Sequence, residues 1–332
     1  MKTIETIIVG NGEAALICAL SVMKAYPEKK AAILSSEEFS FDPNLIYDAD
    51  SFNHNSLWLL RGAIKNRIDN KIILESSEVI KFEKLILATG CRPIVPEISG
   101  IELEGVNFVV KDSDRLRQIR DKSLQAENIV IYGGGYIGVE FCDELLRLGK
   151  NVTIVEKSKR LLPSSFYSEI SNSVQKALED QGGKVQIGIK IKSVVGIDSV
   201  TGVLLKDNSV IDCDFFLICC GSRPNVEVAE KLGLIYDRDR GIFVDEYFHT
   251  SSKDIYAVGE CTARNDFFNG DFSRLLMLSS RFEEAHILGS NLYSLIYNRG
   301  KIIDYLSNRN KINEITGVAE CINHSVYPSL VQ

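Results

Sequence analysis

A strand, a glycine-rich turn and a helix follow one another twice along this chain. The first copy covers residues 4–26, with Gly10 and Gly12 in its turn, and the second covers residues 128–148, with three consecutive glycines from Gly133 onward. In both copies another apolar stretch follows the helix. Repeated units of this kind are typical of parallel, doubly wound sheets, in which the turn after the first strand binds a nucleotide. The two copies therefore predict two nucleotide-binding units.

The second turn carries a complete dinucleotide fingerprint. Gly133 allows the tight turn, Gly135 lets a pyrophosphate approach the backbone, and Gly138 lets the helix lie close to the sheet. Glu156 ends the next strand, 18 residues later (156 − 138), where an acid accepts hydrogen bonds from a ribose diol and repels a 2′-phosphate. The pattern favours NADH over NADPH, although three basic residues soften that preference: Lys157, Lys159 and Arg160. A glycine turn without a ligand is the alternative interpretation.

The first turn is a variant of the same device. Gly10, Gly12 and Ala15 repeat the spacing with alanine in the third position, which is a weaker signal on its own. Ser35 and Ser36 stand where the acid after the second strand is expected. A serine hydroxyl can still form a hydrogen bond with a ribose hydroxyl, but without charge.

The length and composition are those of a globular protein of more than one domain. The 332 residues exceed what one hydrophobic core usually supports. Hydrophobic residues at 45% and charged residues at 25% are ordinary values for such a chain. Lysine and arginine number 38 against 45 aspartates and glutamates, and no dense basic tract occurs. We therefore expect neither nucleic acid nor an anionic membrane surface as a partner.

From the sequence we expect neither a targeting segment nor a metal site. Residues 1–12 carry one short apolar run without a small-residue cleavage site, and no stretch approaches the roughly 20 apolar residues of a membrane helix. The eight cysteines are spread along the chain with no C-x-x-C pair, and there are only four histidines. This pattern favours reduced, mostly buried thiols in a cytoplasmic protein.

Two further apolar strands end in short turns, Thr89-Gly90 and Gly259-Glu260. The order of motifs is a fingerprint, Ala-Thr-Gly, a second fingerprint, Cys-Gly-Ser-Arg-Pro-Asn at 220–225, and Gly-Glu. This order resembles the pyridine nucleotide–disulfide oxidoreductase superfamily of FAD flavoproteins. Within it, the chain is most similar to the branch of NADH oxidases, NADH:rubredoxin reductases and the flavin-binding part of the nitrite reductase large subunit. The resemblance extends over about residues 4–295.

The resemblance implies two cofactor sites. The FAD site would contain Gly10, Gly12, Ala15, Ser35, Ser36, Thr89, Gly90, Gly259, Glu260 and Ser280. The NADH site would contain Gly133, Gly135, Gly138, Glu156 and Gly221. Glu140 would lie near the nicotinamide end as the one candidate catalytic residue, with a solvated helix position as the alternative. Ser279 or Ser280 would cap a long helix whose positive end faces the flavin.

We expect an α/β fold of two three-layer, Rossmann-like domains, with the NAD domain inserted into a discontinuous FAD domain. The FAD domain would cover residues 1–110 and 236–298, the NAD domain 111–235, and a short tail 299–332. Many members of the superfamily add a dimerisation domain after the long helix, whereas only a polar tail follows here. The oligomeric state therefore stays open.

Departures from the family pattern decide the expected chemistry. Residues 36–66 contain no cysteine where disulfide reductases carry a redox pair, and Phe41–Leu45 lacks the arginine and lysine that approach the flavin in this branch. We expect an NADH-dependent flavoprotein whose electrons leave the flavin directly, for a small carrier such as rubredoxin, for dioxygen or for an artificial acceptor. The alternative is a noncatalytic or flavin-depleted NAD(H)-binding subunit of a larger redox assembly.

Overall fold

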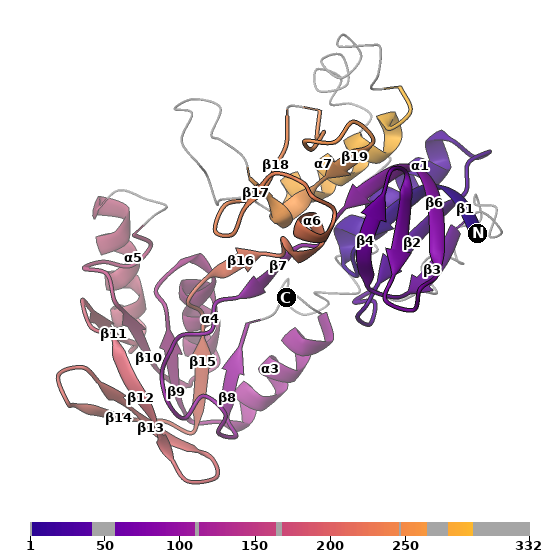
Figure 1. Cartoon of the computed structure of the whole chain (residues 1–332). Coiled ribbons are helices and arrows are strands. Elements are labelled where there is room, and N and C mark those ends of the chain that lie inside the picture. Colours follow the sequence, from indigo (N-terminus) through magenta and orange to yellow (C-terminus); the bar gives the residue numbers. More distant parts are fainter. Residues whose placement is uncertain are drawn as a thin grey trace. The chain divides into compact units, whose positions relative to one another are not determined.

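The computed structural model shows two compact units (Figure 1). The structure describes residues 2–41, 57–109, 113–163, 168–245, 247–263 and 278–294. Unit 1 comprises Met1–Cys91 and Pro224–Gln332, and unit 2 comprises Arg92–Arg223. The prediction that one unit is inserted into the other is confirmed.

Unit 1 is built on a parallel sheet in the order β3-β2-β1-β6, with β19 on the other side of β6. Its elements in chain order are β1 (Lys2–Val9), α1 (Glu13–Ala25), β2 (Ala31–Ser35), β3 (Leu57–Arg61), β4 (Ile64–Ile68), β5 (Lys71–Leu74), β6 (Val79–Leu87), α6 (Glu227–Lys231), β17 (Tyr236–Asp237), β18 (Gly241–Phe243), β19 (Ile255–Ala257), the 3-10 turn η1 (Gly259–Cys261), β20 (Thr262–Ala263) and α7 (Leu278–Asn291). The antiparallel pair β4–β5 extends from the first half of β6 and forms the expected meander.

Successive residues on the strands of unit 1 pack into two apolar layers, one on each face of the sheet. Ile8 and Ile86 pack with the helices α1 and α7, whereas Ile7 and Leu85 pack with the meander and α6. Successive side chains of a strand point to opposite faces, so a continuous apolar run indicates a sheet covered on both sides. Helices, sheet and meander are the three layers of this unit.

Unit 2 repeats the plan with a five-stranded parallel sheet in the order β11-β10-β9-β15-β8. Its elements are β8 (Val106–Phe108), α3 (Ser113–Gln125), β9 (Asn128–Tyr132), α4 (Tyr136–Arg147), β10 (Asn151–Glu156), α5 (Ser168–Asp180), β11 (Lys184–Ile187), β12 (Ile191–Gly196), β13 (Val200–Leu205), β14 (Val210–Asp212) and β15 (Phe215–Ile218). The short strands β7 (Cys91–Pro93) and β16 (Ser222–Pro224) pair where the chain enters and leaves the unit.

The sheet of unit 2 is also covered on both faces. Ile129 and Ile131 pack with α3, α4 and α5, and Val130 and Tyr132 pack with the antiparallel sheet β12-β13-β14. The prediction of two three-layer α/β units is therefore confirmed. Within the described ranges, no helix is long and apolar enough to cross a membrane.

The boundaries between the two units differ from those expected from the sequence. The crossings lie at Cys91–Arg92 and Arg223–Pro224, whereas the predicted boundaries were 110/111 and 235/236. The strand β8 already belongs to the sheet of unit 2, and α6 already packs into the core of unit 1 through Ala229. Boundaries drawn at turn signals miss such short elements. The predicted tail 299–332 lies outside the described residues.

Candidate functional site

The two glycine turns occupy matching positions at the carboxyl ends of the central strands β1 and β9 (Figure 1). The N–H of Gly10 donates to the carbonyl of Leu34 at 3.0 Å, and the N–H of Gly133 donates to the carbonyl of Val155 at 2.8 Å. Ligands of open parallel sheets bind at this edge. Both fingerprints are therefore where a dinucleotide site requires them.

Each turn also lies in close contact with the end of the neighbouring strand. This contact explains why the first position of each fingerprint is a glycine. A Cβ on Gly10 would lie 2.2 Å from the carbonyl oxygen of Ala88, and a Cβ on Gly133 would lie 2.3 Å from that of Cys219. No side chain fits at either distance. The structure thus matches residues 88–90 of unit 1 with residues 219–221 of unit 2.

The second glycine of each turn leaves room for a ligand. Gly12 and Gly135 are the N-cap residues of α1 and α4, and neither helix has a side-chain cap bond. A Cβ on Gly135 would have no atom within 4 Å, and one on Gly12 would meet only Ser40 Oγ at 3.8 Å. Open helix N-termini of this kind bind phosphate groups through backbone N–H groups. Each glycine turn together with the open helix N-terminus that follows it is called a cradle below. Both cradles fit the diphosphate of a dinucleotide.

The third position differs between the turns. A Cβ on Gly138 would lie 1.9 Å from the carbonyl oxygen of Gly133, so only glycine fits there. Ala15 occupies the matching position in unit 1 and is fully buried. The helix α4 therefore lies closer to its turn than α1 does. This explains why the first fingerprint tolerates an alanine.

Glu156 lies directly at the second glycine turn. Its Oε2 accepts a hydrogen bond from the N–H of Gly134 at 2.6 Å, and its Oε1 accepts one from the N–H of Ser158 at 2.7 Å. The side chain is 5% exposed. Each carboxylate oxygen keeps a further acceptor site, so the residue can still receive a ribose hydroxyl.

Ser35 stands at the same position of the sheet as Glu156, because each follows the residue paired with the end of the central strand. Its hydroxyl is engaged locally: Oγ donates to the carbonyl of Glu37 and accepts from the N–H of the same residue, both at 2.9 Å. Ser36 is exposed. The Asn11 side chain donates to the carbonyl of Glu38 at 3.0 Å. The loop after β2 therefore folds over the first turn.

The sequence analysis did not assign Asn11 or Glu37 to the candidate site. The Nδ2 of Asn11 lies 3.5 Å from Oε2 of Glu37, which puts an exposed acid beside the first glycine turn. The signal was present in the sequence, because Glu37 comes only two residues after the end of the strand. It was not used because the expected acid position itself holds a serine.

The Thr89-Gly90 and Gly259-Glu260 turns follow the adjacent strands β6 and β19. They are joined by the thiol of Cys91, which donates to Oε2 of Glu260 at 3.2 Å. These two turns and the first glycine turn follow the parallel neighbours β6, β19 and β1, so all three lie at one edge of the sheet. Gly90 has φ +62° and Gly259 has φ +81°, a backbone region that favours glycine.

Gly221 takes the same place in unit 2 that Gly90 takes in unit 1. It has φ +96°, and its carbonyl accepts a hydrogen bond from the N–H of Ile94 at 2.9 Å. The predicted position beside the second glycine turn is consistent with the contact of Gly133 to Cys219.

Glu140 is an exposed residue of α4. Desolvation of its carboxyl group by the surrounding protein atoms, together with the nearby charge of Glu144, raises the pKa of that group. The structure therefore fits both the functional and the solvated interpretation of this residue. Ser280 lies in the first turn of α7, and its side chain is outside the described residues.

Within the described ranges, the cysteines are thiols that are not joined in disulfides. Burial raises the pKa to about 12 for four of them: Cys18, Cys142, Cys213 and Cys220. Burial also raises the pKa of Cys219 and Cys261. Among the residues that the structure describes, no group of three or more potential metal ligands occurs.

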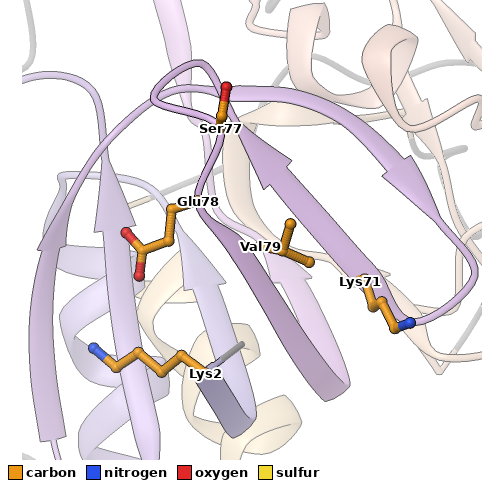
Figure 2. Close-up of a pocket in the computed structure, with 5 residues that line it drawn as sticks. All are labelled: Lys2, Lys71, Ser77, Glu78 and Val79. Carbon is orange, nitrogen blue, oxygen red and sulfur yellow. The ribbon is translucent and has the colours of Figure 1, made fainter.

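A shallow depression lies elsewhere on unit 1, lined by Lys2, Lys71, Ser77, Glu78 and Val79 (Figure 2). Lys2 and Val79 begin the parallel strands β1 and β6. The depression is thus at the amino ends of these strands, opposite the glycine turns. It is no part of the dinucleotide site.

The family described as pyridine nucleotide-disulphide oxidoreductase matches residues 4–287. The chain belongs to this family. Its glycine turns, their matched positions and the order of the remaining motifs agree with the match, and the resemblance predicted from the sequence is confirmed.

Several curated relatives carry names from the expected branch. The chain is 32% identical over 231 residues to the NADH oxidase of Streptococcus pneumoniae, covering 64% of this chain and 50% of that protein. It is 27% identical over 269 residues to the rubredoxin-NAD(+) reductase of Pseudomonas putida, covering 80% and 69%. The crystal structure of the ferredoxin reductase for the CYP199A2 system from Rhodopseudomonas palustris superposes with a TM-score of 0.74 at 26% identity, covering 88% and 76%. The chain spans only half of the streptococcal oxidase.

Proposed function

We propose that this chain is an FAD-dependent NADH oxidoreductase that transfers electrons from NADH to a small carrier protein or a small-molecule acceptor, without a redox disulfide. The observation that carries the proposal is the pair of matched dinucleotide cradles, one in each unit. Only the second has a buried acid at the ribose position, Glu156. Two such cradles in one chain suit two different dinucleotides.

Unit 1 would hold FAD. Its diphosphate would lie over the open N-terminus of α1 at Gly12, close to the Thr89-Gly90 turn. The adenosine ribose would lie near Ser35 and Ser36, with Glu37 as a further acceptor on the same loop. The Gly259-Glu260 turn would face the ribityl–phosphate segment.

Unit 2 would hold NADH. Its diphosphate would lie at the N-terminus of α4, where Gly135 leaves open space. Glu156 would accept the ribose hydroxyls, and its charge would disfavour a 2′-phosphate. Gly221 would lie under the dinucleotide, and Glu140 on α4 near its nicotinamide end.

The flavin supplies the hydride-acceptor and electron-donor chemistry when it is bound. The contribution of the chain is to bind and orient the two dinucleotides, and the hydride step needs no side-chain acid or base. A thiol relay requires a thiolate of low pKa. Six of the described cysteines have raised pKa values instead, which supports direct transfer to the acceptor.

The acceptor class is inferred from the relatives. One is named for rubredoxin and one solved structure for a ferredoxin, both small electron carriers, while others are named NADH oxidase. We therefore propose a carrier protein of this kind, or dioxygen, as the acceptor.

The proposal is tested on the purified chain of residues 1–332. Its visible spectrum should show flavin bands, and chromatography of the acid-released cofactor should identify FAD. NADH should then bleach the flavin, and a panel of rubredoxin, ferredoxin, dioxygen and ferricyanide should identify the acceptor. Release of FMN alone, or a colourless protein that FAD cannot reconstitute, would contradict the proposal. A colourless protein that still binds NADH would favour the noncatalytic alternative.

A further inference from the structure

Asn225 forms a closed set of hydrogen bonds with the Thr89-Gly90 turn. Its Nδ2 donates to the carbonyl of Thr89 at 2.8 Å, and the hydroxyl of Thr89 donates back to the carbonyl of Asn225 at 2.7 Å. The backbone N–H of Asn225 donates to the carbonyl of Gly90 at 2.9 Å. Three bonds thus connect one residue to a turn that lies 135 positions away in the sequence (225 − 90).

The matched turn of unit 2 is held more simply. The N–H of Ile94 donates to the carbonyl of Gly221, just as the N–H of Asn225 donates to that of Gly90. Cys220 takes the place of Thr89, and its thiol donates to the carbonyl of Tyr132 at 3.6 Å. The side-chain part of the arrangement is therefore an addition specific to unit 1.

The residues on either side of Asn225 are fixed in the apolar core of unit 1. Pro224 and Val226 on either side are buried, and Val226 belongs to the apolar core that contains Ala229 and Leu232 of α6. The opposite side of the turn is open, because a Cβ on Gly90 would have no atom within 4 Å. The turn is thus fixed on one side and accessible on the other.

We propose that Asn225 is a positioning residue for the flavin, which holds the Thr89-Gly90 turn in the conformation that receives the FAD diphosphate. This inference rests on the proposed assignment of FAD to unit 1. An amide is required because the side chain must donate, while a carboxylate of the same shape would place an acceptor against the carbonyl of Thr89.

The test compares FAD affinity in full-length variants freed of flavin. N225D should weaken FAD binding by about tenfold or more, because the partly buried carbonyl of Thr89 loses its donor and faces an acceptor instead. T89V should weaken FAD binding by a similar factor, whereas T89S keeps the hydroxyl and should bind FAD as the parent does. In the double variant N225D/T89V, the loss of FAD affinity should be smaller than the product of the losses in the two single variants. NADH affinity should change by less than about twofold in all of them, since the second cradle is unaltered.

Two controls separate positioning from stability. N107D removes a similar amide bond, from Asn107 Nδ2 to the carbonyl of Gly105 at 3.0 Å in unit 2, and should leave FAD affinity unchanged. Hydrogen exchange in the flavin-free chain should be faster at the amide of residue 225 in N225D than in the parent, a measurement that needs no FAD.

The outcomes are distinct. If N225D and T89V both bind FAD within twofold of the parent, the positioning role is wrong while the proposed function stands. If the parent itself does not bind FAD, both proposals fail. If N225D does not fold, the comparison of T89V with T89S decides, because T89S keeps the hydroxyl. Equal FAD affinities of T89V and T89S would then overturn the inference.

Discussion

The two units share one plan but differ where a ligand would touch them. In each, a central strand, a glycine turn and a helix N-terminus form the cradle, and antiparallel strands cover the far face of the sheet. The matched positions that differ include Ala15 and Gly138, Ser35 and Glu156, and Thr89 and Cys220. The backbone of the cradle is thus reused, and a few side chains adapt it.

The difference at the ribose position is electrostatic. Unit 2 places a buried carboxylate on the turn itself, held by two backbone N–H groups. Unit 1 places a neutral serine there and folds a loop with the exposed Glu37 over the turn. Charge at a desolvated position discriminates strongly between ligands that differ by a phosphate. Under the proposed function, unit 2 would be the unit that selects against NADPH.

Exchange of the third fingerprint residue should have the largest effect. G138A places a Cβ 1.9 Å from a backbone oxygen, so the helix must move. We expect a loss of about 3 kcal/mol in the free energy of unfolding and NADH binding weaker by on the order of a hundredfold. Denaturant unfolding and NADH titration measure both.

The reverse exchange in unit 1 is the matched control. A15G removes a buried methyl group without any overlap and should cost about 1 to 2 kcal/mol of stability. FAD binding should persist. If G138A were as mild as A15G, the closer approach of α4 to its turn would be refuted.

The second prediction concerns Glu156. E156S makes unit 2 resemble unit 1 and should reduce the preference for NADH over NADPH on the order of tenfold, because a like-charge contact of about 1 kcal/mol or more disappears. Stopped-flow bleaching of the flavin with each nucleotide gives the ratio. E179Q removes a charge from α5 and should leave it unchanged. Equal rates in the parent would mean that the basic residues after Glu156 control the selectivity.

The third prediction is smaller and concerns the packing of α1 on α7 in unit 1. His286 Nδ1 lies 2.9 Å from Ser21 Oγ, and burial, with the charge of Lys24, lowers the pKa of its ring. The unfolded chain then binds the proton more readily, so stability falls as the pH drops below the ordinary value of about 6.5. Unit 2 (residues 92–223) contains no histidine.

Thermal unfolding between pH 7.5 and 5.5 tests this. The parent should lose about a few degrees more than H286Q over that interval. An equal loss in both proteins would show that His286 stays neutral or finds a new partner when it is protonated.

The repeated strand–turn–helix pattern predicted the two α/β units, because hydrophobic periodicity and glycine spacing are local signals. The insertion of one unit into the other was expected only with the family resemblance. The sequence could not give the crossings at Cys91 and Arg223. They depend on β8 and α6, elements of 3 and 5 residues whose place is set by tertiary packing.

The candidate site also contains residues that local spacing predicts and residues that depend on distant contacts. Gly133, Gly138 and Glu156 could be read from spacing, since each serves its own turn. Asn225 could not, because its role follows from hydrogen bonds to a turn far away in the sequence. The engagement of Ser35 with Glu37 was equally hidden, because a serine offers no pattern that distinguishes a ligand contact from a local turn.

The last prediction is that neither unit uses a thiol in electron transfer. Cys91 and Cys261 are the cysteines nearest the flavin-site turns. The Cys91 thiol donates to Glu260, a contact that only the protonated form can make, and burial raises the pKa of Cys261. Alkylation of the NADH-reduced protein, C91S and C261S should each leave acceptor reduction within about twofold, because reactive thiols need a low pKa. A loss above about tenfold in either variant, with FAD still bound, would place a thiol on the electron path and make unit 1 a disulfide-type site.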